Sequence, residues 1–415
     1  MIRRAPVFRW MTLPAETQRT AVRVGELCQK ATHWEFVYNA DYLALGPLAW
    51  ELDPIRIRTK QRSPYTVVGA APHGVFCDVA LSGWSLDALH KRRHELPGLL
   101  SGQGNDREPW GWWERLIYAP ADGFGALFVG EPDSKPLLGT VLIDQLLKVT
   151  KATLMPAHMQ TSSGAMGGER PKLTAYRNEG GTGDAPVILK FALPSERADS
   201  VVAEATALSL ASELGLRVPA HHVDLINDVP ALSIERFDRG FGKSGLAYHC
   251  VSAATALELI PGADRDDRRR SYVQLRSKLK QAGDALELYR RIVLNAAVGN
   301  SDDHPWNTSL RQTGLGSWEL SPLYDVMPFF AHRPPTVMSM ALRRGGERAA
   351  TSENLVAAGL EIAGLKSEAA QAAMDEIFQH VRAHWRRVFN QHAAHLPAAT
   401  ADDWAPVFAP SDQAR

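Results

Sequence analysis

The chain has 415 residues, of which 45% are hydrophobic and 22% are charged, so it is long enough for two or three globular domains. Acidic and basic residues balance at 46 each, which excludes a global charge that would drive the whole molecule onto nucleic acid or an anionic membrane. Cys28, Cys77 and Cys250 have no CxxC spacing, which disfavours a zinc or disulfide framework and favours a reducing compartment. Because neither a signal-peptide core nor about 18 uninterrupted apolar residues is present, we expect a cytoplasmic protein with no membrane partner.

Residues 1–150 are expected to form a strand-rich subdomain. Segment 34–38 (Trp-Glu-Phe-Val-Tyr) has the alternation of a strand, and 125–130 is a short apolar run between glycines. Residues 97–113 are rich in Gly, Pro and Trp, which predicts a long loop whose tryptophans serve packing. Apolar residues at helical spacing predict a helix over 133–150.

A glycine-rich segment, 163–172, opens the second region, which we expect to span 151–245. Gly167 and Gly168 would allow backbone N–H groups to approach phosphate oxygens, and Lys172 would add positive charge. The GxxxxGK[ST] pattern of a P-loop is absent from the chain, so this segment does not by itself define a nucleotide site.

Lys190 interrupts the apolar run 186–191, which is typical of a buried strand. Burying an unpaired ammonium group is costly, so this lysine either has an anionic partner or extends to water at the strand end. The following segment, 201–211, has apolar residues at helical spacing and contains Glu204. We therefore predict an ion pair between Lys190 and Glu204. Residues 231–239 then run from an apolar strand into alternating charges.

The third region, 246–400, is predicted to be helical, followed by a tail over 401–415. One apolar stripe ends at Gly299, which marks a helix C-terminus, and a second predicts a core-facing helix over 366–392. His380 and His384 on the second helix are spaced for a metal, but no acidic or cysteine ligand is evident beside them, which disfavours a metal site. The stripes consist of Leu286, Tyr289, Val293 and Ala296, and of Ile377, Val381, Trp385 and Val388.

The segment 300–307 carries the strongest chemical signal. Asp302 and Asn307 stand in a D-x-x-x-x-N arrangement, and Asp325 follows in an apolar setting. Protein kinases use this order, with a loop aspartate orienting the hydroxyl and an asparagine and a later aspartate binding Mg²⁺. Phosphoryl transfer requires it because hard oxygen ligands must neutralise charge beside the nucleophile. The alternative is an ordinary polar turn.

Seven motifs, in this order, resemble the HipA family of bacterial serine/threonine kinases, the toxin component of HipBA toxin–antitoxin modules. Two short N-terminal segments resemble the family more weakly. The motifs are Gly-Gly-Glu-Arg-Pro-Lys ending at Lys172, Ile-Leu-Lys ending at Lys190, Glu204, Glu-Leu-Gly-Leu-Arg-Val-Pro ending at Pro219, Ile-Glu-Arg-Phe-Asp-Arg ending at Arg239, Gly-Asn-Ser-Asp-Asp-His-Pro-Trp-Asn ending at Asn307, and Leu-Ser-Pro-Leu-Tyr-Asp-Val ending at Val326.

The resemblance implies a role for each matching residue. Asp302 would be the catalytic base, Asn307 and Asp325 would bind Mg²⁺, and Lys190 would contact the ATP phosphates. The backbone of 235–237 would contact adenine, and His304 would be a structural member of the catalytic loop. The three hinge residues are Glu235, Arg236 and Phe237.

One departure from the family concerns regulation. Many members have a serine seven residues before the loop lysine, and its autophosphorylation expels the glycine loop and switches the kinase off. Here that position is Ala165, and Ser162 and Ser163 lie two and three residues earlier. A neighbouring serine takes over, or the off-switch is absent, or the loop is aligned differently.

The sequence thus predicts an α+β, two-lobed protein-kinase-like fold with a strand-rich N-terminal subdomain and an all-helical C-terminal lobe. The predicted activity is that of an ATP- and Mg²⁺-dependent protein serine/threonine kinase, with a translation component such as an aminoacyl-tRNA synthetase as the implied target. A HipB-like helix-turn-helix antitoxin is the implied partner, and DNA would be reached only through it. The alternatives are a DNA-associated regulatory subunit with little kinase activity and a kinase acting on a small molecule or lipid.

Overall fold

The computed structural model describes residues 2–13, 16, 18–59, 64–91, 109–134, 141–142, 170–178, 184–192, 195–226, 228–240, 246–330, 336–394, 396 and 400–409. The chain divides into two compact units, each built from three segments. Unit 1 comprises Met1–Leu189, Arg236–Val251 and Gln312–Ser317, and unit 2 comprises Lys190–Glu235, Ser252–Arg311 and Trp318–Arg415. The division of the chain into four regions, which the sequence predicts, stays a prediction. Within the described ranges, no helix is both long and apolar enough to cross a membrane.

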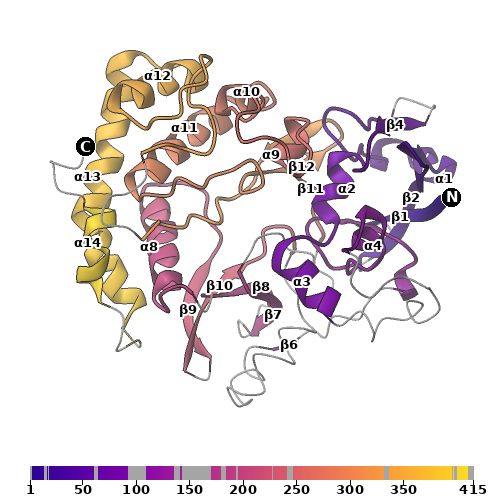
Figure 1. Ribbon diagram of the computed structural model, residues 1–415, viewed down its shortest axis with the longest axis horizontal. Coiled ribbons are helices and arrows are strands. Elements are labelled where there is room, and N and C mark those ends of the chain that lie inside the picture. Colours follow the sequence, from indigo (N-terminus) through magenta and orange to yellow (C-terminus); the bar gives the residue numbers. More distant parts are fainter. Residues whose placement is uncertain are drawn as a thin grey trace. The chain divides into compact units, whose positions relative to one another are not determined.

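Strands and helices follow one another in short runs along the chain (Figure 1). The strands are β1 (Arg3–Met11), β2 (Thr20–Gln29), β3 (His33–Tyr38), β4 (Tyr65–Val68), β5 (Leu127–Val129), β6 (Val141–Leu142), β7 (Lys172–Asn178), β8 (Asp184–Phe191), β9 (His221–Ile226), β10 (Val229–Glu235), β11 (Cys250–Ser252), β12 (Ser309–Gly314) and β13 (Ser317–Leu320). The helices are α1 (Ala40–Ala44), α2 (Gly74–Val79), α3 (Gly83–Lys91), α4 (Trp112–Ile117), α8 (Ser200–Glu213), α9 (Ala253–Ala256), α10 (Tyr272–Arg276), α11 (Ala282–Ala297), α12 (Ser352–Ala363), α13 (Ser367–His392) and α14 (Ala401–Phe408), with short 3₁₀ turns at Gly46–Leu48 and Pro132–Ser134.

The N-terminal sheet of unit 1 has the strand order β4-β3-β2-β1-β5, and its pairs are antiparallel. The predicted strands at 34–38 and 125–130 are confirmed as β3 and β5. Alternate residues of β3, Trp34, Phe36 and Tyr38, are buried, as expected for a strand with one face on a core. Gly25 of β2 permits this packing, because a Cβ there would lie 2.5 Å from the Phe36 ring and 2.3 Å from the Val37 carbonyl oxygen.

Two further sheets follow. The second has the order β6-β7-β8-β10-β9, with β6 parallel to β7, and the third has the order β11-β12-β13. Strand β8 confirms the predicted apolar strand at 186–191, and its residues are buried on both faces. The buried run of β10 likewise confirms the strand predicted to precede the charged segment at 235–239.

Two predictions in the N-terminal half were wrong in part. The helix expected over 133–150 is not formed at Val141–Leu142, which is the strand β6; its parallel pairing with β7 is a distant contact that local spacing does not reveal. The loop expected over 97–113 ends early, because α4 begins at Trp112. The tryptophans do serve packing: Trp113 stacks on Trp34 at a centroid distance of 6.2 Å. Residues 92–108, 135–140 and 143–150 lie outside the described part of the chain.

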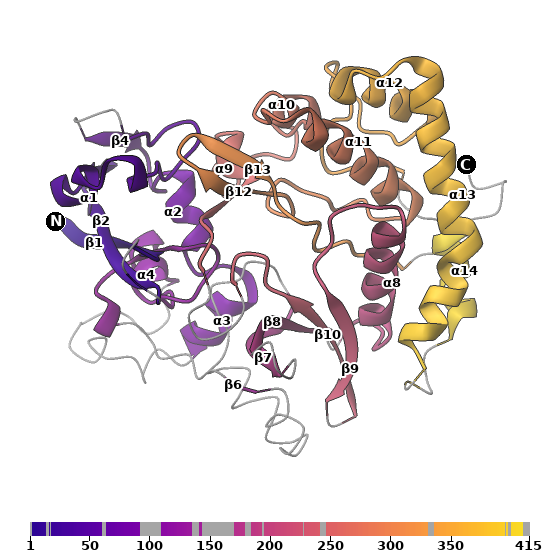
Figure 2. The ribbon, with the colours of Figure 1, turned by 180° about the vertical axis from the view of Figure 1, so that it is seen from behind.

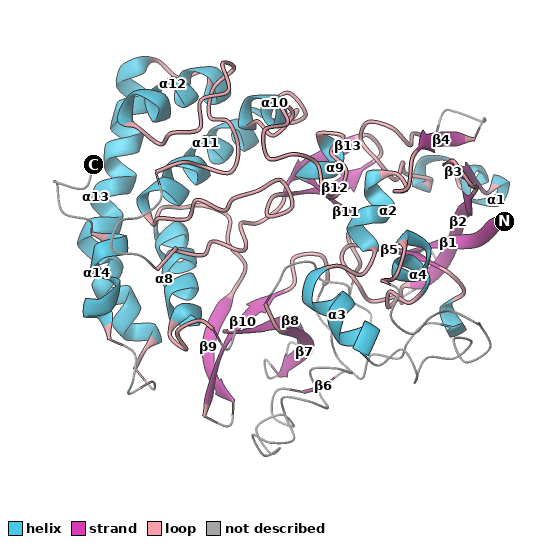
Figure 3. Cartoon of the chain, in the orientation of Figure 1, coloured by secondary structure: helices cyan, strands magenta, loops and turns pink. Residues whose placement is uncertain are grey.

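Helices dominate unit 2 (Figure 3). The helices predicted from the apolar stripes are confirmed as α11 and α13, and all four stripe residues of α13 are buried. The buried face of α11 lies part of a turn away from the predicted stripe. Leu286 of the stripe is 42% exposed, whereas Leu288 and Ile292 are buried. Figure 2 shows α11, α12 and α13 lying against one another, and α13 also packs on α8.

The close approach of these helices depends on Gly359 of α12. A Cβ at this position would lie 2.7 Å from the Ala370 Cβ and 2.9 Å from the Tyr289 ring. Gly359→Ala should therefore lower the free energy of unfolding by about 1–3 kcal/mol, although alanine favours helices by nearly 1 kcal/mol. Urea unfolding tests this, with Gly283→Ala in α11 as the control, because a Cβ there meets open space. Equal effects of the two substitutions would contradict the packing argument.

A polar cluster joins α8, β9 and α13 within unit 2. The Ser209 hydroxyl oxygen lies 2.9 Å from His221 Nε2 and 2.8 Å from His392 Nε2, and His221 Nδ1 lies 2.9 Å from the Pro219 carbonyl oxygen. These side chains line a cavity of about 630 Å³, whose lining does not include the candidate site residues below. Burial lowers the pKa of His221 and lowers that of His392 to about 4.

This cluster predicts a loss of stability in mild acid. A histidine with a lowered folded pKa contributes its full stability above its unfolded pKa of about 6.5, and this contribution is lost as the pH falls toward the folded value. Between pH 6.5 and 4, His392 should lower the free energy of unfolding by up to about 1.4 kcal/mol per pH unit. Urea unfolding across this range should show a flatter pH dependence for His392→Gln. The same slope in the variant would exclude His392 as a source.

Candidate functional site

The predicted ion pair between Lys190 and Glu204 is present, and a second carboxylate joins it. Lys190 Nζ, at the end of β8, lies 2.7 Å from Glu204 Oε1 and 2.6 Å from Asp325 Oδ1. The Lys190 and Glu204 side chains are 7% and 0% exposed, whereas that of Asp325 is 30% exposed. Burial alone would lower the pKa of Lys190, but the two carboxylates outweigh it and raise this pKa above its ordinary value.

The local sequence explains why the three groups meet. Helix α8 is buried almost all round, so Glu204 enters the interior with its helix and requires a cation there. Asp325 has φ = 58°, a left-handed conformation that non-glycine residues seldom adopt, although Asp tolerates it better than most. Such backbone geometry persists where the surroundings over-determine it, and it is frequent at functional sites.

The three charged groups also have a charge imbalance. Two carboxylates face one ammonium group, so the triad carries one surplus negative charge, with its exposed end at Asp325. Among the described residues, no three His, Cys, Asp or Glu side chains form a metal cluster. The carboxylate oxygens of the triad are donors of the type that suits Mg²⁺, which proteins commonly hold through one or two carboxylates together with substrate phosphates.

The segment with Asp302 and Asn307 begins where α11 ends. Gly299 has φ = 70°, and the Asn300 N–H donates to the Asn295 carbonyl at 2.8 Å, which terminates the helix. The Asp302 side chain is exposed, and the Asn307 amide donates to the Asp302 carbonyl at 3.1 Å. The predicted base is thus presented to solvent by a loop that Asn307 helps to hold.

Asp303 is the buried anchor of this loop. Its carboxylate accepts hydrogen bonds from the Tyr272 hydroxyl at 2.7 Å and from the Asn295 amide at 2.8 Å, both on Oδ2. Burial raises the pKa of Asp303, and the hydrogen bond from Tyr272 opposes that effect. The sequence pattern did not predict this anchoring role of Asp303, or its partners Asn295 and Tyr272. The sequence feature that could have indicated this anchor is a second asparagine, Asn295, five residues before Asn300.

The segment with Asp325 is bonded to the same loop. The Tyr324 hydroxyl donates to the Trp306 carbonyl at 3.0 Å and lies 2.5 Å from the Ser309 hydroxyl. Further along, the Phe329 N–H donates to the Gly299 carbonyl at 3.1 Å. The two loops that carry Asp302, Asn307 and Asp325 therefore form one hydrogen-bonded substructure of unit 2.

The glycine-rich segment is described only at its end. Gly167, Gly168, Ser162 and Ser163 lie outside the described residues, and Lys172 is buried at the start of β7. At the predicted hinge, the N–H groups of Glu235 and Arg236 donate to the Ala220 and Pro186 carbonyls, both at 2.8 Å. Adenine contacts at 235–237 stay a prediction, and they would have to use other backbone groups.

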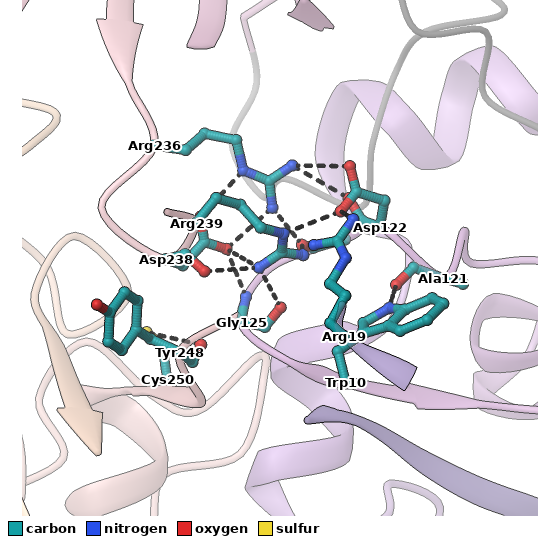
Figure 4. A network of polar contacts seen from close by, with 11 residues as sticks. Trp10, Arg19, Ala121, Asp122, Gly125, Arg236, Asp238, Arg239, Tyr248 and Cys250 are labelled. Atoms are coloured by element: carbon teal, nitrogen blue, oxygen red, sulfur yellow. Dashed lines mark hydrogen bonds and ion pairs between the residues drawn. The ribbon is translucent and has the colours of Figure 1, made fainter. Parts of the chain in front are cut away.

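The run 235–239 has a second role within unit 1, shown in Figure 4. The Arg236 guanidinium is 2% exposed; its Nε and Nη2 lie 2.9 Å from the Asp238 carboxylate, and its Nη2 donates to the Gly123 carbonyl at 2.7 Å. Arg239 bonds Asp122 at 2.9 Å. Burial would raise the pKa of Asp122, but Arg236, Arg239 and Arg19 lower it to about 2. The charged side chains of 236–239 thus bind the segment 122–125.

This network predicts a large loss of stability on removal of one charge. Asp238 is buried and also accepts the Gly125 N–H at 2.8 Å, so Asp238→Asn would leave two buried guanidinium groups underneutralised. We expect the free energy of unfolding to fall by about 3–5 kcal/mol. Urea unfolding checks this against Asp402→Asn, since Asp402 is 86% exposed in its pair with Arg386 and should contribute at most about 1 kcal/mol. Similar losses for both would contradict the role of the network.

The fold and this geometry define a class of protein: a kinase-like α+β fold, with the Lys–Glu–Asp triad beside a D-x-x-x-x-N loop. The model of the HipA-like C-terminal domain matches residues 164–385, more than half of the chain. The chain therefore belongs to the HipA-like family.

Three individual proteins are similar to this chain. HipA in the HipA, HipB and operator DNA complex of Shewanella oneidensis MR-1 superposes with a TM-score of 0.61 over 94% of both chains at 16% identity, which shows the shared fold. The Helicobacter pylori proinflammatory kinase CtkA matches 57% of this chain and 87% of its own at 10% identity, with a TM-score of only 0.38. A curated relative from Sinorhizobium fredii, named "Putative kinase Y4mE", is 28% identical over 150 residues, 34% of this chain. The match spans about a third of that relative's length.

Proposed function

We propose that the chain is an ATP- and Mg²⁺-dependent protein serine/threonine kinase and the toxin of a toxin–antitoxin module in the cytoplasm. The observation that carries this proposal is the bonding of Lys190 to both Glu204 and Asp325 in a HipA-family chain with a D-x-x-x-x-N loop. A regulatory subunit without activity has no need of this arrangement.

Each residue has a distinct part in the proposal. Asp302, exposed on its loop, accepts the proton of the substrate hydroxyl. Lys190 gives its charge to the nucleotide phosphates, and Glu204 holds the lysine in place. Asp325 and Asn307 would hold Mg²⁺, which when bound neutralises the phosphate charge. Lys172, Gly167 and Gly168 are assigned to the phosphate-binding loop, and 235–237 to adenine.

The proposed partners follow from the family. The related HipA structure contains HipB and operator DNA, so we assign a HipB-like antitoxin to this chain and DNA only through it. The protein substrate is a component of translation such as an aminoacyl-tRNA synthetase. Control by phosphate on Ser162 or Ser163 is also part of the proposal, and intact-mass measurement after incubation with Mg²⁺ and ATP tests it.

Phosphoproteomics after brief induction in growing cells tests the function. The wild type should arrest growth and add phosphoserine or phosphothreonine to few proteins, and an Asp302→Asn chain should do neither. An unchanged phosphoproteome with arrest by both chains would refute the kinase and favour a regulatory subunit. Arrest by the wild type alone, with labelled metabolites or lipids and no labelled protein, would favour the small-molecule kinase.

A further inference from the structure

Arg270 occupies an unusual position next to the candidate catalytic loop. It precedes α10, and its side chain is only 9% exposed. The guanidinium carbon lies 5.6 Å from the ring centroid of Trp306, which stands between Asp302 and Asn307 in the loop. Among the described residues, Arg270 Nε has no hydrogen-bond partner. A buried N–H donor normally has an acceptor, so the Nε–H of Arg270 is available to a ligand.

Two more arginines belong to the same folded segment. Arg348 donates to the Arg265 carbonyl, and the Arg270 carbonyl accepts the Ala341 N–H at 2.9 Å. Bridges between Ser271 and Ala341 and between Val337 and Ala349 fix the backbones that bear Arg270 and Arg348. Burial, and then the charges of Arg348 and Arg265, lower the pKa of Arg270. The three cations thus repel one another and are held together by the backbone.

The nearby carboxylates do not neutralise this group. Asp267 is bonded by Arg269, with Nη2 at 2.6 Å from Oδ2 and Nε at 3.0 Å from Oδ1. Asp266 is 93% exposed and reaches Arg348 only at 3.8 Å. Asp267 and Asp302 act on Arg270 through their charges alone. Arg270 thus lies close to the residue that would meet the substrate hydroxyl without a carboxylate bonded to it among the described residues.

We propose that Arg265, Arg270 and Arg348 bind an anionic side chain of the protein substrate, next to the hydroxyl that receives phosphate. Guanidinium groups bind carboxylates and phosphates through paired N–H donors, so an acidic or already phosphorylated residue would suit them. Arg270 lies over the ring of Trp306, which belongs to the catalytic loop. An anionic residue bound there would therefore lie within a few residues of the acceptor serine or threonine along the substrate chain. The inference rests on the proposed function and adds the substrate class: serine or threonine near an acidic residue.

Peptide phosphorylation tests this directly. Four serine peptide libraries would be compared, which carry alanine, aspartate, phosphothreonine or lysine at the positions flanking the acceptor. The wild type should have a kcat/KM on the order of tenfold higher for anionic than for alanine peptides, which corresponds to about 1.4 kcal/mol from a charge-assisted contact. In Arg265→Gln/Arg348→Gln this ratio should fall toward one, chiefly through KM for the anionic peptides. Arg348→Glu should shift the preference toward lysine peptides.

The comparison of aspartate with phosphothreonine peptides shows which of the two anions is preferred. Arg386→Gln is the control variant, because that arginine pairs with Asp402 and lies far from the three arginines in the sequence. If the peptides are too short to be phosphorylated, the phosphorylation sites mapped in extract proteins show the same preference for anionic flanking residues. Equal rates on all libraries would overturn the anion site and leave kinase activity standing. Inhibition by an RNA oligonucleotide without anionic preference would assign the arginines to nucleic acid instead. Absence of transfer to peptides and extract proteins alike would overturn the kinase, and the anion site with it.

Discussion

Asp302→Asn is expected to lower the rate of phosphoryl transfer by about two to four orders of magnitude while the free energy of unfolding changes by less than about 0.5 kcal/mol. The carboxylate is exposed, so its replacement removes a proton acceptor and no buried contact. Steady-state transfer of labelled phosphate and urea unfolding of the same preparation measure both quantities. Near-normal turnover would refute the assignment of the base.

The adjacent Asp303 provides the matched control for this experiment. Its carboxylate accepts hydrogen bonds from Tyr272 and Asn295 in the interior. Asp303→Asn should lower the free energy of unfolding by about 1–3 kcal/mol, because a neutral amide replaces the charged acceptor of these two hydrogen bonds. One aspartate should thus affect catalysis without stability, and its neighbour should affect stability first. If Asp303→Asn left stability unchanged and abolished transfer, Asp303 would become the candidate base.

Lys190 and Glu204 should prove to be one functional unit. Lys190→Met should lower phosphoryl transfer about a hundredfold or more, because the phosphates lose a fixed charge. Glu204→Gln should have a smaller effect, since Asp325 still holds the lysine. The double variant should be no less active than Lys190→Met alone, because the two losses share one cause. Additive losses in this cycle would reduce Glu204 to a structural residue.

The stability of the same variants distinguishes structure from catalysis. Lys190→Met leaves Glu204, which is fully buried, without its main counter-charge and should cost about 3–5 kcal/mol. Neutralising Glu204 as well should restore part of that stability without restoring transfer. Recovery of both in the double variant would mean that Lys190→Met had acted only through the fold.

Much of this site was predictable because burial and charge constrain one another. A lysine in a strand as apolar as 186–191 needs a partner, and Glu204 lies on the next helix. The third member, Asp325, was identified by its place after the D-x-x-x-x-N loop, but its bond to Lys190 spans 135 residues and is a property of the fold alone.

What could not be predicted depends on distant contacts. Asp302 and Asp303 are chemically identical in the sequence, and distant contacts such as those with Tyr272 and Asn295 decide which one turns inward. The run 235–239 reads as alternating charges and would suit a surface. Yet Arg236 is buried, because the Asp122 and Gly123 carbonyls, more than a hundred residues earlier, accept its N–H groups. Likewise, β6 forms because it pairs with β7. Its local sequence favours a helix, because its apolar residues have helical spacing.

The most direct test of the central claim is transfer of the terminal phosphate of labelled ATP by the purified chain to proteins of a cell extract. With Mg²⁺ present, the wild type should label a small set of proteins on serine or threonine, and the label should disappear with a chelator and in Asp302→Asn and Asp325→Asn. Label that persists in both variants, or a wild type that transfers none under the same conditions, would contradict the account.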